Sequence, residues 1–306
     1  MTYTVKYKPC NLKACLFLFS ALLFLVIGIF MTHQGYWILG QLLVGVFFLQ
    51  SFILLHETGH YSFFKGRGLN SFFGHFFGFL SVIPFSSWVD IHNQHHKWTG
   101  WRDKDPTTTG TVNPNHGKAV RFIVNISWVL FFPIFTIGYR VGNYWNLKKI
   151  KQFSPKTNLD YVLMNLLLIW MVWGVGLFLF WDEAIKYIIG GFVLGLAYSD
   201  LIILSQHSHI DIPVSKGKAV RPIKYINQIQ YTRSISFFKL LDYWVLFNFN
   251  LHEKHHAFPG VPAYFLGKKE MDEPNKRPFL NYLLKAKLMT GEQFIFSTSK
   301  NSGKEI

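Results

Sequence analysis

The sequence predicts an all-α integral membrane protein with four transmembrane helices in two hairpins, interfacial helices, and a histidine-rich cap on the cytoplasmic side. Half of the 306 residues are hydrophobic and only 15% are charged, whereas a soluble globular protein has about 25% charged residues. Four long apolar runs are nearly free of charge, and nearly all of the lysines and arginines lie outside them.

The four apolar runs are long enough to cross a bilayer, because a hydrocarbon core of about 30 Å needs about 20 helical residues. Only residues 32–35 separate the first two runs, and only Asp182 and Glu183 separate the last two. Connections this short predict two helical hairpins. The runs cover residues 12–31, 36–55, 159–181 and 184–204.

The basic residues orient these helices. The chain has 31 Lys and Arg against 16 Asp and Glu, a formal net charge of +15. Lys6, Lys8 and Lys13 lie before or at the start of the first run, and other basic residues follow the second run, precede the third and follow the fourth. Since Lys and Arg accumulate in cytoplasmic loops, we expect both termini and the active site in the cytoplasm. This distribution favours an anionic membrane surface, not nucleic acid, as the partner.

Two further apolar stretches, 69–89 and 119–139, are interrupted by Pro84 and Pro133. Basic residues at both ends of the second stretch argue against a crossing, so we interpret both as interfacial helices on the cytoplasmic side. A pair of true crossings would give the same orientation downstream. We expect a membrane domain over residues 1–270 and a cytoplasmic C-terminal extension over residues 271–306.

Ten of the 13 histidines lie in four tight groups. One group is a pair four residues apart, two are triplets with the spacing His-x-x-His-His, and one is a pair two residues apart. Residues three and four apart share one face of a helix, so the first pair and each triplet can direct their imidazoles at a single point. The ten are His56, His60, His92, His95, His96, His207, His209, His252, His255 and His256.

So many histidines on one predicted membrane face indicate a metal centre. Imidazole suits Zn, Cu, Fe and Ni, but one tetrahedral ion takes only four ligands, so eight to ten histidines fit two ions. The only cysteines, Cys10 and Cys15, provide no thiolate cluster. The hypothesis that accounts for these ligands is a pair of iron ions with O2 as co-substrate.

A different reading applies to the first pair alone. His56-Glu57-Thr58-Gly59-His60 also fits His-Glu-x-x-His, in which the Glu is the general base of a zinc metalloprotease. An intramembrane protease of that kind would leave the other eight clustered histidines unexplained. Glu57 is then interpreted as a hydrogen-bond partner of a ligand imidazole, with a solvated charge at the helix end as the alternative.

With these motifs the chain resembles the membrane fatty acid desaturases over about residues 12–266. That family has one His-x(3,4)-His box and two His-x(2,3)-His-His boxes, which residues 56–60, 92–96 and 252–256 match in order. Phe258-Pro259-Gly260-Val261-Pro262 follows the third box, and Gln206-His207-Ser208-His209 is similar to a stretch of the acyl-lipid delta-12 and omega-type subgroup.

The resemblance also implies roles for single residues. His207 is expected to complete the metal site, with His209 as the alternative. Glu57, Asp105 and Asp200 are expected to support the ligands, although Asp105 could be a solvated loop charge and Asp200 could simply face the bundle interior. The implied iron ligands are His56, His60, His92, His95, His96, His207, His252, His255 and His256.

The activity that the resemblance implies is O2-dependent oxidation of a lipid acyl chain from CH2–CH2 to a double bond. A related di-iron hydroxylase, or a carotenoid ketolase or hydroxylase, would use the same site and remains the alternative. The chain has no His-Pro-Gly-Gly signature, nucleotide fingerprint or ferredoxin-type cysteine cluster. We therefore expect a separate electron donor, ferredoxin-like or cytochrome b5-like, attracted to basic residues such as Lys65, Arg67, Lys97 and Arg102.

Overall fold

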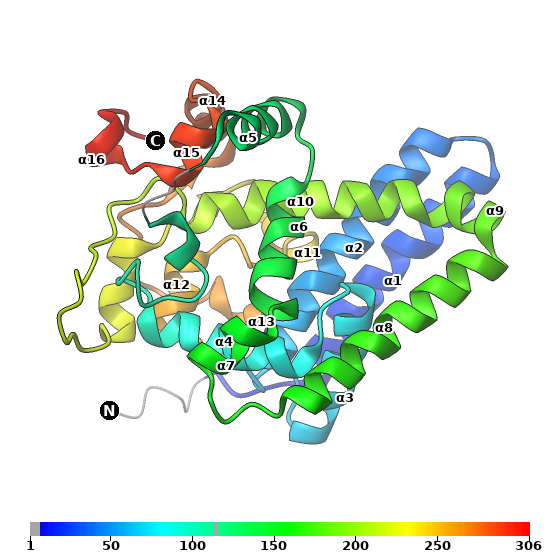
Figure 1. The fold of residues 1–306 in the computed structure, drawn as a ribbon. Coiled ribbons are helices and arrows are strands. Elements are labelled where there is room, and N and C mark those ends of the chain that lie inside the picture. The colour runs from blue at the N-terminus through cyan, green and yellow to red at the C-terminus, as the bar shows by residue number, and fades with distance from the viewer. Residues whose placement is uncertain (1–6, 113–115) are drawn as a thin grey trace.

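The computed structural model describes residues 7–112 and 116–306, so Lys6 lies outside the described residues. Within these ranges the protein is almost entirely helical (Figure 1), with one pair of two-residue strands. This confirms the predicted fold class. The structure contains four helices that are long and apolar enough to cross a membrane, which are α1 (Asn11–His33), α2 (Trp37–Gly59), α8 (Leu159–Leu179) and the continuous helix Trp181–His207.

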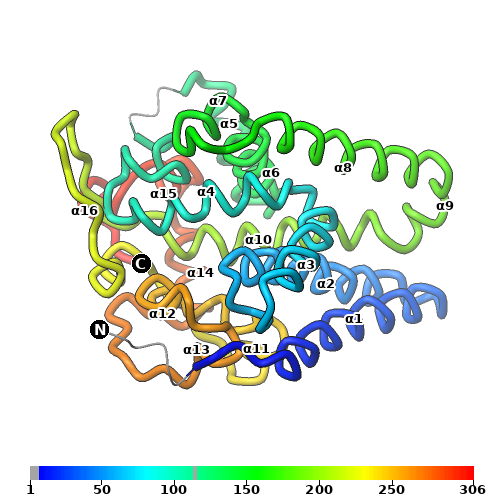
Figure 2. Tube along the Cα trace, turned by 90° about the horizontal axis from the view of Figure 1, so that it is seen from below, coloured from blue at the N-terminus to red at the C-terminus, as the bar shows by residue number. Residues whose placement is uncertain are grey.

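The four long helices form the two expected hairpins. The fourth is built from α9 (Trp181–Ala184), a π-helical turn η3 (Ile185–Ile189) and α10 (Gly190–His207). In both Figure 1 and Figure 2 the α1–α2 turn and the α8–α9 turn lie at the same end of the molecule. The histidine-bearing segments therefore gather at the opposite end, where α2 and α10 finish.

Each of the two interrupted apolar stretches forms two short helices with a sharp bend. The first gives α3 (Arg67–Leu80) and α4 (Phe85–Trp98), bent by 100°, and the second gives α5 (Lys118–Leu130) and α6 (Ile134–Arg140), bent by 119°. Pro84 and Pro133 are the residues just before α4 and α6. Proline has no N–H and cannot continue the preceding helix, but it is compatible with the start of the next one.

The long helices pack closely through small residues. A Cβ added to Gly40 would lie 2.1 Å from Thr32 Oγ1 and 2.6 Å from the Gly28 carbonyl oxygen, across the α1–α2 contact. A Cβ on Gly191 would lie 2.3 Å from Val44, across the α2–α10 contact. Small residues let helix backbones approach in this way within membranes, so α2 is enclosed between α1 and α10.

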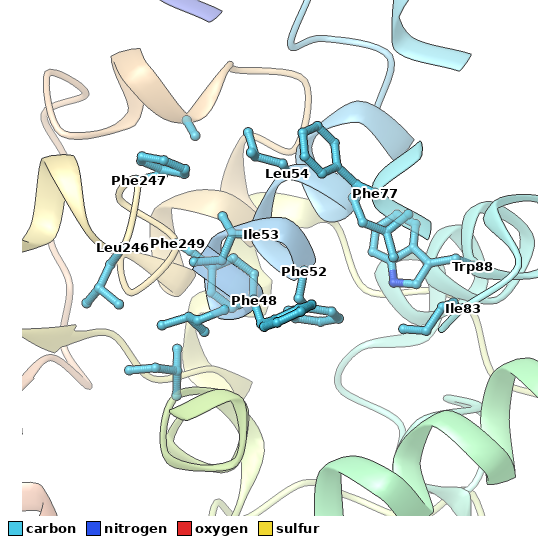
Figure 3. Close-up of a cluster of buried hydrophobic side chains, with 14 of the residues drawn as sticks. Phe48, Phe52, Ile53, Leu54, Phe77, Ile83, Trp88, Leu246, Phe247 and Phe249 are labelled. Atoms are coloured by element: carbon cyan, nitrogen blue, oxygen red, sulfur yellow. The ribbon is translucent and has the colours of Figure 1, made fainter. Parts of the chain in front are cut away.

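The C-terminal half of α2 is buried in an aromatic core (Figure 3). Its Phe48, Phe52 and Ile53 lie between Phe249 of the loop before the third histidine box and Trp88 of α4. Burying large apolar side chains stabilises the fold by about 1.5–3 kcal/mol each. This core fixes the positions of three histidine-bearing segments relative to each other.

The C-terminal residues fold back onto the preceding part of the chain. Strand β1 (Ile235–Ser236) pairs in parallel with β2 (Arg277–Pro278), and Trp128 of α5 donates its Nε1–H to the Met289 carbonyl oxygen at 3.2 Å. The remaining elements are η1 (Thr109–Thr111), η2 (Val141–Trp145), α7 (Leu147–Phe153), η4 (Tyr225–Tyr231), α11 (Lys239–Trp244), α12 (His252–Ala257), α13 (Ala263–Leu266), α14 (Phe279–Lys287), α15 (Gly291–Phe296) and α16 (Ser299–Ser302).

Candidate metal centre

Four helix segments bring nine of the histidines together at one end of the bundle. The end of α2 carries His56 and the adjoining His60, and the last residue of α10 is His207. The second half of α4 carries one triplet, and the short helix α12 consists largely of the other. Seven of the nine are at most 6% exposed, and His60 and His207 are half-buried, so the cluster is shielded from bulk water.

The nine histidines form two groups, in each of which one ring nitrogen per residue lies within 4.8 Å of all the others. The groups adjoin each other, since the ring centroids of His96 and His256, one from each group, are 4.4 Å apart. The first group is His56, His60, His92, His96 and His255, and the second is His95, His207, His252 and His256.

Each triplet divides between the two groups, so the expectation that a triplet points at a single centre is wrong. His92 and His96 belong to the first group, while His95 belongs to the second. On a helix with 3.6 residues per turn, residues four apart differ by about 40°, whereas adjacent residues differ by about 100°. Neighbouring His95 and His96 therefore diverge. In the second triplet the middle histidine, His255, belongs to the first group, and His252 and His256 belong to the second.

The nitrogen atoms within each group are spaced like ligands around an ion. The Nε2 atom of His92 lies 3.0 Å from the Nε2 atoms of both His60 and His96. In the second group, the Nε2 atom of His252 lies 2.9 Å from that of His207 and 3.0 Å from that of His256. A neutral imidazole has only one N–H, so such chains of nitrogens cannot all be joined by hydrogen bonds.

This spacing also discriminates between coordination geometries. With metal–nitrogen bonds of about 2.1 Å, ligands at right angles are about 3.0 Å apart, whereas tetrahedral ligands are about 3.4 Å apart. The observed values of 2.9–3.0 Å match ligands at right angles, as in a five- or six-coordinate ion. In addition, the buried Nε2 atom of His56 has no hydrogen-bond partner. The residues therefore fit two metal ions, and they fit a tetrahedral zinc site poorly.

Hydrogen bonds on the far side of the rings fix their orientation. His56 Nδ1 donates to Glu57 Oε1 at 2.9 Å, and His95 Nδ1 donates to Asp105 Oδ2 at 2.7 Å. The outer oxygens of both carboxylates are also occupied, since Glu57 Oε2 accepts from the Ala263 amide and Asp105 Oδ1 accepts from the Thr107 amide. These contacts hold the tautomer in which Nε2 is free to bind a metal.

One such partner was not predicted from the sequence. Gln228 of η4 is fully buried, accepts from His256 Nδ1 at 2.9 Å through its Oε1, and donates to the His96 carbonyl oxygen at 2.7 Å through its Nε2. It therefore connects one histidine of each group. Nothing in the sequence marks this glutamine, because it lies in a 3-10 turn without periodicity, 28 and 132 residues from its partners.

Electrostatics keep these imidazoles neutral. Burial, followed by repulsion between neighbouring histidines, lowers the pKa values of His252, His255 and His256 well below the usual value. Burial raises the pKa of Asp105, but the proximity of His95 outweighs it, so that the pKa of this carboxyl is lowered overall. Neutral imidazole is the form that binds metals, and an ionised Asp105 is the form that accepts a hydrogen bond from His95 Nδ1–H.

The two histidines that follow each other at the end of α10 lie in different surroundings. His207 lies in the second group, whereas His209 lies outside both groups. The Nε2 atom of His209 lies 2.9 Å from Ser302 Oγ and 3.1 Å from the Lys304 carbonyl oxygen, so this side chain holds the C-terminal segment.

The position of Asp200 does not support a role beside the ligands. Its Oδ1 accepts from the Thr136 amide, which links α10 to α6. Among the described residues, no hydrogen bond joins Asp200 to a histidine of either group. Asp200 faces the interior of the helix bundle, which was the alternative reading.

A cavity of about 430 Å³ opens onto both histidine groups. His56 and His92 border it from the first group, and His95, His207 and His252 border it from the second. Much of its remaining wall is apolar and comes from α2, α6, α10 and the loop before α12, with Phe52, Phe135, Ile203, Leu204 and Phe249 among the lining residues. Such a cavity suits a hydrocarbon chain placed against the metal-binding nitrogens.

The sequence model of the fatty acid desaturase family matches residues 32–274, which include all nine grouped histidines. The chain belongs to the fatty acid desaturase family. Members of this family are oxidoreductases that act on lipid acyl chains, so this desaturase is an enzyme of lipid metabolism.

Named relatives of the desaturase agree with this assignment. An sn-1 acyl-lipid omega-3 desaturase (ferredoxin) of Nostoc sp. (strain 36) is 26% identical over 86% of this chain and 75% of its own length. A fatty acid desaturase of Bacillus subtilis (strain 168) is 24% identical over 84% of this chain and 76% of its own length. A Delta(12) fatty acid desaturase of Mortierella alpina is 24% identical over 77% of this chain and 66% of its own length. These similarities favour neither the protease nor the hydroxylase alternative.

Proposed function

We propose that this desaturase holds two iron ions in its two histidine groups and uses O2 to convert a CH2–CH2 unit of a lipid acyl chain into a double bond. The observation that carries the proposal is the pair of adjoining nitrogen clusters that opens into an apolar-walled cavity. The proposed ligands are His56, His60, His92, His96 and His255 for one ion and His95, His207, His252 and His256 for the other.

The bound metals would supply the oxidising power that no side-chain acid or base can provide, because removal of hydrogen from an unactivated CH2 group requires a cofactor. The protein's own contribution is positioning. Glu57 and Asp105 hold the rings of His56 and His95, and Gln228 holds the ring of His256. Histidine rings that are fixed in this way keep their positions around the metals while the substrate reacts.

The cavity walls would place one segment of a featureless chain beside the metals. Phe52 of α2 packs edge-to-face on Phe249 with ring centroids 6.0 Å apart, and Phe249 packs on His56 with centroids 4.8 Å apart. The wall nearest the metals is therefore rigid and aromatic. A rigid wall restricts which carbon atoms reach the centre, and this restriction determines the position of the double bond.

The overall reaction requires an external reductant. One CH2–CH2 unit, one O2, two electrons and two protons give one CH=CH unit and two molecules of water. We infer that a separate one-electron carrier supplies the electrons from the cytoplasm. The distribution of Lys and Arg supports this orientation, since basic residues flank the helix ends that lie near the histidines.

Expression in a bacterial host with a compatible electron donor tests the proposal. Gas chromatography with mass spectrometry of total fatty acids should reveal products that have lost two hydrogens. Products that have instead gained an oxygen atom would identify a hydroxylase and contradict the proposal. The variant His255→Ala should abolish the product, whereas His33→Ala, which removes an exposed histidine outside both groups, should retain it.

A further inference from the structure

The segment that follows α10 forms a projecting basic surface. In Figures 1 and 2 the loop after α10 extends from the body at the end opposite the α8–α9 turn. No Asp or Glu occurs between Asp211 and Asp242. Four basic residues of this loop are exposed and form no ion pair among the residues that the structure describes, and we call them the basic loop residues. They are Lys216, Lys218, Arg221 and Lys224.

The basic loop is anchored at several points, so its charges are presented in a defined arrangement. The Arg102 amide donates to the Pro213 carbonyl oxygen at 2.9 Å, and Trp101 Nε1 donates to the Arg221 carbonyl oxygen at 3.0 Å. Asp103 accepts from both the amide and the hydroxyl of Ser215. Residues Lys216 and Gly217 both have positive φ, of 52° and 78°, which is typical of a tight turn at a loop tip.

The same segment leads directly to the metal centre. Tyr225, the first residue of η4, is 49% exposed, yet its ring centroid lies 6.5 Å from that of His96. Three residues later, Gln228 contacts both His96 and His256, and the Tyr231 carbonyl oxygen lies 3.3 Å from His207 Nδ1. The seven residues of η4 thus connect the exposed basic surface with histidines of both groups.

We propose that the basic loop and the exposed face of η4 are the docking surface for an acidic one-electron carrier of the ferredoxin type. This inference rests on the proposed function, which requires two electrons per turnover. Charge complementarity steers an acidic partner to the four basic loop residues. The half-exposed apolar side chains of Tyr225 and Ile226 provide the contact area beside these charges.

The location is favourable for electron transfer because the rate of electron tunnelling falls steeply with distance. A carrier seated on η4 is separated from His96 by one aromatic ring. Of the cations considered from the sequence, Arg102 fits less well, because it is half-buried and donates to Thr111 Oγ1.

The first experiment measures the oxidation of a reduced [2Fe–2S] ferredoxin by the purified desaturase in stopped flow. The double variant Lys216→Glu/Lys218→Glu should lower the second-order rate constant by about tenfold at low salt, and the deficit should shrink as salt rises. The control Lys148→Glu/Lys156→Glu makes the same charge change at exposed residues outside the loop and should change the rate less than twofold. Equal effects of the two double variants would overturn the proposal.

A second arm separates docking from chemistry. When dithionite replaces ferredoxin, a single turnover should give the same yield of unsaturated product in wild type and in Lys216→Glu/Lys218→Glu. A yield that falls equally with dithionite would show that the loop acts on the fold or the substrate, and it would overturn the docking proposal. Absence of a double bond in every arm, wild type included, would instead remove the proposed function.

The route through η4 is tested by Tyr225→Ala. This variant should lower the limiting rate at saturating ferredoxin more than it changes the apparent KM for ferredoxin, and Tyr225→Phe should restore the rate because it keeps the ring. Unchanged kinetics in Tyr225→Ala would contradict the route. Charge-dependent reduction by cytochrome b5 together with no reduction by ferredoxin would contradict the identity of the partner.

Discussion

The substitution Asp105→Asn tests how the outer hydrogen bonds control metal binding. Asp105 is 2% exposed; its Oδ2 accepts from His95 Nδ1 at 2.7 Å, and its Oδ1 accepts from the Thr107 amide at 2.8 Å and the Thr107 hydroxyl at 2.9 Å. The side chain of asparagine has one acceptor oxygen, whereas the carboxylate of aspartate has two. Whichever way its amide turns, its NH2 group faces a donor, so either His95 Nδ1–H or the part-buried Thr107 amide loses its hydrogen bond to this side chain.

The size of the effect follows from these contacts. A buried donor left without an acceptor costs about 1–3 kcal/mol, and loss of the hydrogen-bond partner of a ligand imidazole lowers metal affinity by about 10–100-fold. That range corresponds to about 1.4–2.7 kcal/mol. Since His95 is one of four histidines in the second group, we expect Asp105→Asn to weaken one of the two ions and to affect the other little.

Competition of the protein with a ferrous chelator under anaerobic conditions measures this affinity. Asp103→Asn is the matched control, because Asp103 lies two residues away and bonds to Ser215, not to a histidine. We expect retention of iron to fall for Asp105→Asn and to remain near the wild-type value for Asp103→Asn. Equal affinities in wild type and Asp105→Asn would refute the reasoning that this carboxylate orients a ligand.

Three further predictions concern the same site. Protein carrying His207→Gln should contain about one iron fewer per chain by elemental analysis, whereas His209→Gln should keep the full content, and the opposite pattern would exchange their roles. Gly59→Ala should lower the thermal midpoint, since its Cβ would lie 2.1 Å from the Trp88 ring and overpacking costs about 1–3 kcal/mol. Gly68→Ala, which meets no atom within 4 Å, is its control. Treatment with a chelator should lower the thermal midpoint and added Fe2+ should restore it, whereas a midpoint indifferent to metal would argue against a bound ion.

Much of the architecture could be predicted because it depends on local rules. Hydrophobic length identifies the four long helices, and prolines mark the two bends. Histidine spacing identifies the two triplets and the first pair. These features depend on residues within about one or two helical turns of each other, which is the range over which sequence periodicity is informative.

The arrangement within the site could not be predicted in the same way. Whether His95 or His96 shares a centre with His56 depends on how α4 is rotated against α2, and tertiary packing sets that rotation. The same holds for Gln228, whose partners are distant in sequence, and for Asp200, which bonds to the Thr136 amide across two helices. The C-terminal segment also makes contacts that its composition does not reveal. One example is the Met289 carbonyl oxygen, which accepts from Trp128 Nε1 of α5.

The metal content of the protein purified without oxygen tests the central claim most directly. Elemental analysis combined with Mössbauer spectroscopy should find two iron ions per chain, both in nitrogen-rich, five- or six-coordinate environments. A single iron per chain, or zinc in tetrahedral coordination with full enzymatic activity, would contradict the assignment of the nine histidines to two iron sites.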